Sequence, residues 1–141
     1  MQAFNSTMDI SIYFQPSERF GTSRPEWLPN TLGDNSTFHT NKGFPSLEGA
    51  RIALFGVLDD PGHARPRGCV RAPDAIRNEL YQLYLPAGQL HVVDLGDIHP
   101  GASAGDTQHA VAETIAELMR MNVVPVLLGG GQGHTFAQYL A

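Results

Sequence analysis

The sequence predicts an α/β fold in which a parallel sheet is covered by helices on both faces, in three layers. Three apolar segments, 51–57, 91–95 and 123–128, begin about 30–40 residues apart, which is the length of one β-α-β unit. Apolar residues recur at helical spacing between these segments. Because β-α-β crossovers are right-handed, we expect the three strands to run parallel.

The first unit starts with the strand 51–57, whose residues are almost all apolar, as in a strand buried on both faces. A polar loop rich in glycine and proline follows at 59–72. We expect a helix over 73–84, because Pro73 suits the first helical turn and apolar residues then recur every three or four positions.

The second unit starts with the strand 91–95 and continues with a helix expected over 106–121. Asp106 or Thr107 can cap the start of this helix, since their side-chain oxygens accept hydrogen bonds from free backbone N–H groups. Asn122 can end the helix, because asparagine tolerates a left-handed backbone. The third strand follows at once.

The N-terminal part of the chain has a different character. Residues 1–48 are rich in polar residues, glycine and proline, and we expect an arm with one short strand near 10–14. Three prolines between positions 16 and 29 favour little regular structure over 17–45. Such an arm either lies across the parent domain or a partner subunit, or is a partly disordered terminus. Residues 49–141 form the predicted α/β domain.

The composition bounds the class of protein. A chain of 141 residues with 42% hydrophobic residues is long enough for one packed domain. A net charge of −5 argues against a nucleic-acid binder. No apolar run approaches the roughly 20 residues of a membrane span. The single cysteine, Cys69, excludes an intrachain disulfide and is expected to be a small buried residue in a cytoplasmic protein.

Polar side chains follow each of the three strands. The carboxyl ends of parallel strands meet at one edge of a sheet, where ligands bind in open α/β folds. Polar residues also gather in such loops simply because the loops face water. The candidate site residues are His63, Arg65 and Arg67 in the first loop, Asp97 and His99 in the second, and Gly129, Gly130, Gly131 and His134 in the third.

Two hypotheses for these loops follow from residue type. His63, His99 and His134 would bind a metal if the fold brought them together. Arg65 and Arg67 either hold a substrate carboxylate, or bond carbonyl groups of the loop or pair with Asp59 or Asp60.

The glycines at 129–131 allow the backbone to approach a ligand closely at the turn that follows the third strand. Such a turn can bind phosphate. No Lys-Ser/Thr pair follows, which excludes a P-loop, and no glycine stands at 134, which excludes the dinucleotide motif. A flavodoxin-like domain that binds another anion here is one alternative.

Four segments stand in an order and spacing typical of one known family. They are Gly56-Val57 with 65–68, the helix opening at 72–77, Val93-Asp94-Leu95-Gly96-Asp97, and Leu128-Gly129-Gly130-Gly131. Together they resemble the arginase/agmatinase/formiminoglutamase (ureohydrolase) family. The resemblance covers about residues 49–141 and is closest to formimidoylglutamase-like members over 10–16 and 75–84.

The resemblance implies a hydrolase with a three-layer arginase-like fold that cleaves the C–N bond of a small amidine or guanidino compound at a two-manganese centre. The family's later ligand segments, Asp-x-His-x-Asp and Asp-x-Asp, do not occur in this sequence. The resemblance therefore implies the first three β-α units of a longer enzyme, inactive by themselves. An open sheet edge would favour self-association, and the parent is expected to be a homo-oligomer.

One position departs from the family pattern. Gln132 stands where the family has its first metal-binding histidine, and a neutral amide is a poor manganese ligand. His134, two residues on, is a substitute ligand if the turn is irregular. Otherwise this branch lacks the ligand, and the alternative is a non-catalytic assembly or binding module.

Overall fold

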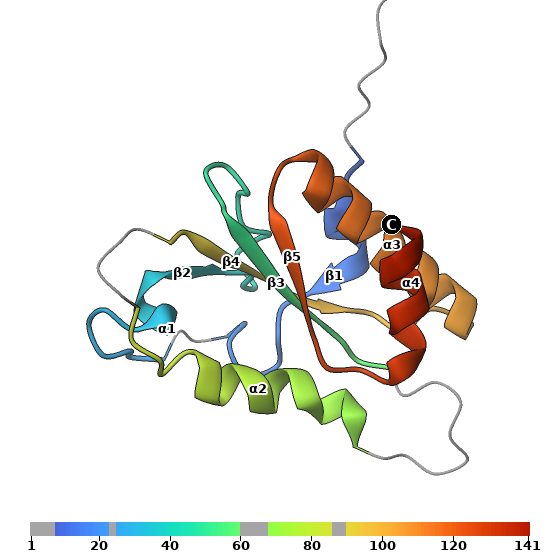
Figure 1. Cartoon of the computed structure of the whole chain (residues 1–141). Helices are drawn as coiled ribbons and strands as arrows, with labels where there is room; N and C mark the ends of the chain where they lie inside the picture. The colour runs from blue at the N-terminus through green and yellow to red at the C-terminus, as the bar shows by residue number, and fades with distance from the viewer. Residues whose placement is uncertain (1–7, 23–24, 60–67, 86–89) are drawn as a thin grey trace, which may run out of the picture.

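Three parallel strands form the centre of the sheet in the computed structural model, which describes residues 8–22, 25–59, 68–85 and 90–141. They are β3 (Ile52–Val57), β4 (Val92–Ile98) and β5 (Val124–Leu128), with β3 in the middle (Figure 1). The expected parallel core of an α/β fold is therefore confirmed. Each strand is within a few residues of its predicted position.

The N-terminal residues join this sheet, which makes it mixed. β1 (Phe14–Gln15) pairs antiparallel with the end of β4. β2 (Ser36–Phe38), after the one-turn helix α1 (Leu32–Asn35), pairs parallel with the start of β4. Two short elements, α1 and β2, thus lie within 17–45, where little regular structure was expected. The boundary at residue 48 stays a prediction.

The strand expected near 10–14 is instead the 3-10 helix η1 (Ile10–Tyr13), and only Phe14 lies in a strand. The carboxylate of Asp9 accepts a hydrogen bond from the Ser11 N–H at 3.1 Å and so caps this turn. Alternating apolar residues favoured a strand here, but a local side-chain cap favours a turn. Ile10 is still buried.

The two long helices are close to their predicted ranges. α2 (Ala72–Leu80) follows the short 3-10 helix η2 (Cys69–Arg71) and ends before the predicted residue 84. Cys69 is half-buried rather than fully buried. α3 is Ala104–Arg120.

The cap of α3 differs from the prediction. Ser103 is the N-cap, and Asp106 completes a capping box by accepting a hydrogen bond from the Ser103 N–H at 2.8 Å. At the other end Asn122 has the expected left-handed backbone, with φ of 58°.

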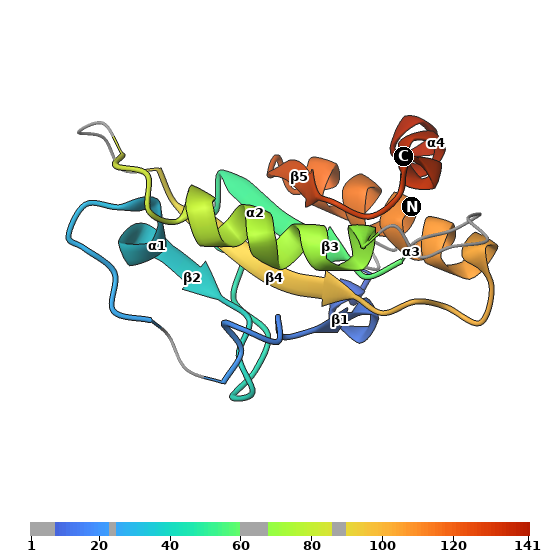
Figure 2. The same ribbon diagram turned by 90° about the horizontal axis from the view of Figure 1, so that it is seen from below.

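Helices cover both faces of the sheet (Figure 2). α3 and the last helix, α4 (Thr135–Leu140), pack on one face together with η1, and α2 packs on the other face with the segment that contains Phe20 and Leu32. The cluster under α3 includes Phe14, Phe55, Val57, Val93, Leu95, Ile98, Val111, Ile115, Leu118 and Ala137. The cluster under α2 includes Phe20, Leu32, Leu54, Tyr81, Val92 and Leu128.

A β-bulge interrupts β4. In the pairing of β3 with β4, Leu54 lies opposite Asp94 and Gly56 lies opposite Asp97. The step between these pairs is two residues along β3 but three residues along β4, so β4 contains one extra residue. The extra residue is accommodated at Gly96, which has φ of +82°. Residues three apart in a regular strand point to opposite faces, so the bulge is what turns Asp94 and Asp97 to the same face, toward α2.

Apolar side chains are exposed along one side of the molecule. Val124 on β5 is 56% exposed, and β5 pairs only with β3 among the residues described. Phe136, Tyr139 and Leu140 of α4 are also exposed. Self-association through this side stays a prediction. None of the described helices has the length and apolar character to cross a membrane.

Substitution of Gly96 by alanine tests the bulge. We expect Gly96→Ala to reduce the free energy of unfolding by about 1–3 kcal/mol from left-handed backbone strain, and further because the new Cβ would meet the Gln15 carbonyl oxygen. Urea unfolding followed by circular dichroism measures this loss. Gly105→Ala is the control, because a Cβ there would lie 3.6 Å from its nearest neighbour, Ser103 Oγ. Equal stability of the two variants would contradict the prediction.

Candidate functional site

The carboxyl ends of β3, β4 and β5 lie at one edge of the sheet, as their parallel direction requires. Asp59 follows β3, His99 follows β4, and the turn 129–134 follows β5. The predicted residues His63, Arg65 and Arg67 lie outside the described residues, so their roles stay predictions.

Glycines set the path of the turn after β5. Gly129 and Gly130 have φ of +67° and +80°, which favour glycine. A Cβ on Gly129 would lie 2.7 Å from the Cβ of Ala72 at the start of α2. The Gly131 N–H donates to the Asp59 carbonyl at 3.3 Å. These glycines therefore serve the close packing of the turn against β3 and α2.

The two metal-ligand candidates in this turn have opposite environments. Gln132 is exposed, whereas His134 is only 1% exposed. Both ring nitrogens of His134 lack a hydrogen-bond partner within the described part of the chain. Burial lowers the pKa of His134, and the nearby charge of Asp59 opposes this shift only partly. His134 is therefore a neutral imidazole enclosed in the core.

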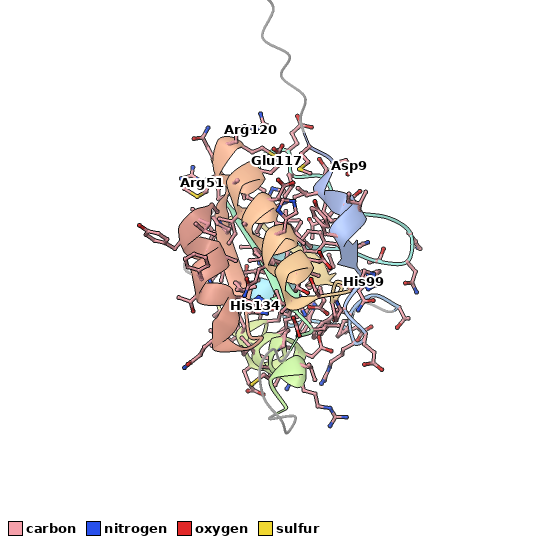
Figure 3. All side chains as sticks on the ribbon, turned by 90° about the vertical axis from the view of Figure 1, so that its right-hand side faces the viewer. Asp9, Arg51, His99, Glu117, Arg120 and His134 are labelled. Carbon is pink, nitrogen blue, oxygen red and sulfur yellow. The ribbon has the colours of Figure 1, made fainter. Side chains whose placement is uncertain are left out.

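The proposed three-histidine metal site is not assembled from the described residues. His99 is exposed at the end of β4, and Figure 3 shows it well apart from His134. No group of three or more metal-ligating side chains occurs within 8–22, 25–59, 68–85 and 90–141.

Asp97 is a partner of a buried arginine rather than a free loop carboxylate. Its Oδ1 accepts from Arg77 Nη1 at 2.7 Å, and the side chain is almost fully buried. Arg77 also donates from Nε and Nη2 to the two oxygens of Asp94, at 2.8 and 3.0 Å, and from Nη2 to the Gly96 carbonyl at 2.8 Å. The Tyr81 hydroxyl donates to Asp94 in a short hydrogen bond.

Sequence reasoning missed Arg77 and Asp94, although signals for both were present. Asp94 is a charged residue inside an apolar strand, and such a residue needs a partner. Arg77 and Tyr81 are four residues apart, so both lie on one face of α2 and its C-terminal turn. That face is the one turned to the sheet.

Opposite charges in this network offset the cost of burial, more than fully for Arg77 and in part for Asp97. Burial alone would lower the pKa of Arg77, but Asp94 and Asp97 raise it by more, so the guanidinium stays charged. Burial raises the pKa of Asp97, and Arg77 opposes that rise. Burial and the charge of Asp94 raise the pKa of Tyr81, which keeps its hydroxyl as a donor.

A cavity of about 400 Å³ adjoins this network at the carboxyl edge. Of the three carboxylates that line it, Asp74 and Asp97 are ion-paired with Arg77, and Glu18 and the guanidinium of Arg71 also line it. Asp74 is held there by Ser17 Oγ at 2.9 Å and by Arg77 Nη1 at 3.2 Å. The lining residues are Glu18, Leu58, Val70, Arg71, Asp74 and Asp97.

Removal of the buried guanidinium should be costly. Arg77→Met leaves Asp94 and Asp97 buried without a counter-charge, and we expect a loss of about 3–5 kcal/mol in the free energy of unfolding. Arg51→Met at an exposed position is the control, with a change within about 0.5 kcal/mol. Urea titration measures both. Similar midpoints for the two variants would refute the role assigned to Arg77.

The neutral imidazole predicts a pH dependence of stability. The folded pKa of His134 lies below its unfolded value of 6.5, so the unfolded state binds the proton more readily. The free energy of unfolding should fall as the pH falls through 6.5, by at most about 1.4 kcal/mol per pH unit. His134→Leu should flatten this slope, whereas His109→Gln, at a 68% exposed side chain, should not. Parallel curves for wild type and His134→Leu would contradict the prediction.

Known proteins share both sequence and fold with this chain. A formimidoylglutamase from Streptococcus gordonii is 36% identical over 100 residues, which cover 67% of this chain and 30% of that protein. A formimidoylglutamase from Streptococcus pyogenes is 33% identical over 99 residues, with 67% and 30% covered. This chain thus spans about 30% of the length of the curated relatives that it matches.

Two solved structures share the fold. A Trypanosoma cruzi formiminoglutamase with Mn²⁺ matches with a TM-score of 0.58 and 22% identity, over 65% of this chain and 34% of that one. The agmatine ureohydrolase of Thermoplasma volcanium matches with a TM-score of 0.59 and 22% identity, over 79% of this chain and 38% of that one.

The sequence model of the Arginase family matches residues 50–141, which contain β3, α2, β4, α3, β5 and α4. This match excludes the alternative that the chain is an unrelated flavodoxin-like domain. The strands and helices of the sheet, the bulge and the glycine turn all lie within the matched region. The chain therefore belongs to the Arginase family.

Proposed function

We propose that this chain is the N-terminal part of a hydrolase that cleaves the C–N bond of a linear amidine, with a formimidoylglutamate-type substrate. The observation that carries the proposal is the 36% identity to a formimidoylglutamase over 100 residues. The remaining length of such an enzyme would supply the groups that complete the site. The chain alone is proposed to be inactive.

The cavity at the carboxyl edge offers groups for both the amidinium and a carboxylate of such a substrate. An amidine is protonated at neutral pH, and its planar N–H groups pair well with carboxylates. Glu18 and Asp74 line the cavity from two different segments, and Arg71 adds one positive charge. This arrangement suits a small molecule that carries an amidinium and a carboxylate.

Manganese is present in the related formiminoglutamase structure, but the described residues of this chain do not by themselves fit it. Gln132, which the family resemblance places at the first histidine ligand, is exposed, and the nearby His134 is buried. The described segments contain no set of three ligating side chains. No step of the reaction is therefore assigned to a metal bound by these residues.

A second candidate is a non-catalytic arginase-like module for assembly or binding. Gln132 favours it, because the loss of an imidazole at this position removes a metal ligand. We also propose a cytoplasmic homo-oligomer. The lone cysteine supports the compartment, and the exposed apolar residues of α4 support the assembly.

Activity distinguishes the two candidates. We expect no turnover of formimidoylglutamate by residues 1–141, and turnover by a polypeptide in which they are followed by the rest of an arginase-type domain. Proton NMR of the released amine measures both. In the active form Glu18→Gln should raise KM roughly two- to fivefold, as for a partly exposed ion pair, and Glu48→Gln at another exposed position should not.

No turnover by the longer polypeptide, with its fold intact by circular dichroism, would favour the non-catalytic module. Turnover by residues 1–141 alone would refute the proposed inactivity of this part.

A further inference from the structure

The turn between β5 and α4 carries a further inference, which rests on family membership and not on the proposed hydrolysis. We infer that this turn supplies an amide, and no imidazole, to the ligand site at the carboxyl edge of the sheet. Gln132 is the side chain presented there, and His134 is committed to the core. The ligand contacted at this turn is then a small polar molecule held by hydrogen bonds, without a metal bound to the turn.

The backbone of the turn is anchored on three sides. Gly129 packs against the start of α2, and the Gly131 N–H is bonded to the Asp59 carbonyl after β3. The Gln108 side chain of α3 donates from Nε2 to the Gly133 carbonyl at 3.1 Å. These contacts come from both faces of the sheet and hold the backbone of the turn in place. The directions of the side chains at 132 and 134 follow from that backbone path.

His134 points inward as a result. It is 1% exposed, and its ring lies next to the position that a Cβ on Gly130 would take, at 3.1 Å from its Cδ2. Its own N–H is bonded to the Gly131 carbonyl at 3.3 Å. Figure 3 shows it between the lower ends of α3 and α4. To reach a ligand the imidazole would have to leave this packing and open the turn.

Gln132 is the alternative that the same backbone offers. It is exposed and has one acceptor and two donors on its amide. An amide oxygen is a weaker manganese ligand than an imidazole, but it binds N–H groups, and the amide N–H₂ binds carboxylates. A ligand with an amidine or carboxylate group matches this chemistry.

Histidine modification tests both halves of the inference on the 141-residue chain. Diethyl pyrocarbonate acylates accessible imidazoles, and mass spectrometry locates each product. We expect His134 to react at least about tenfold more slowly than the exposed His99 and His109, because reaction requires local opening of the turn. Addition of MnCl₂ should leave the rate at His134 unchanged.

The matched variant is Gln132→His. The imidazole placed at 132 should react at the rate of His99, while His134 in the same molecule stays protected. Reaction of His134 in the wild type at the rate of the exposed histidines would overturn the inference, and so would protection of the new imidazole at 132. The wild-type measurement does not depend on whether a variant folds. The modification rates at 132 and 134 are also independent of whether the protein hydrolyses amidines, so this test and the test of the proposed function can fail separately.

Discussion

The ion pairs of one buried arginine connect the layers of this fold. Arg77 has no exposed surface, and its donors reach Asp94 and Asp97 on β4 and the carbonyl of Gly96 between them. A buried charge is tolerated only when such partners are in place. The network therefore fixes the position of α2 along β4. Apolar contacts alone would allow α2 to shift along the sheet more easily.

The bulge in β4 and the arginine depend on each other. Without the extra residue Asp94 and Asp97 would point to opposite faces, and Arg77 could not reach both. The bulge in turn is held by the Gly96 N–H donating to Asp94 Oδ1 at 2.9 Å. Gly56 is part of the same arrangement, because a Cβ there would meet Asp97 Oδ1. The Asp-Leu-Gly-Asp segment is thus one structural unit that brings β4 and α2 together beside the cavity.

Periodicity was enough to predict the central strands and the two long helices, because each buries a regular apolar stripe. It was not enough for β1 and β2, which have two and three residues and no period of their own. Asp97 was predicted as a loop carboxylate because the bulge that turns it inward depends on the backbone of Gly96. The turn residues were predicted as site candidates, but their burial depends on contacts with α3 and β3 that are distant in sequence.

The turn after β5 shows why family membership predicts the position of a site more safely than it predicts the chemistry of that site. The glycines that set the path of the turn pack against α2 and β3, so their replacement would disturb the fold. The side chain at 132 is exposed, and exchange of an exposed side chain usually changes stability little. The side chain at 132 can therefore change while the fold is kept. Buried His134 cannot take over without leaving the core, so this branch is free to change its ligand at that edge.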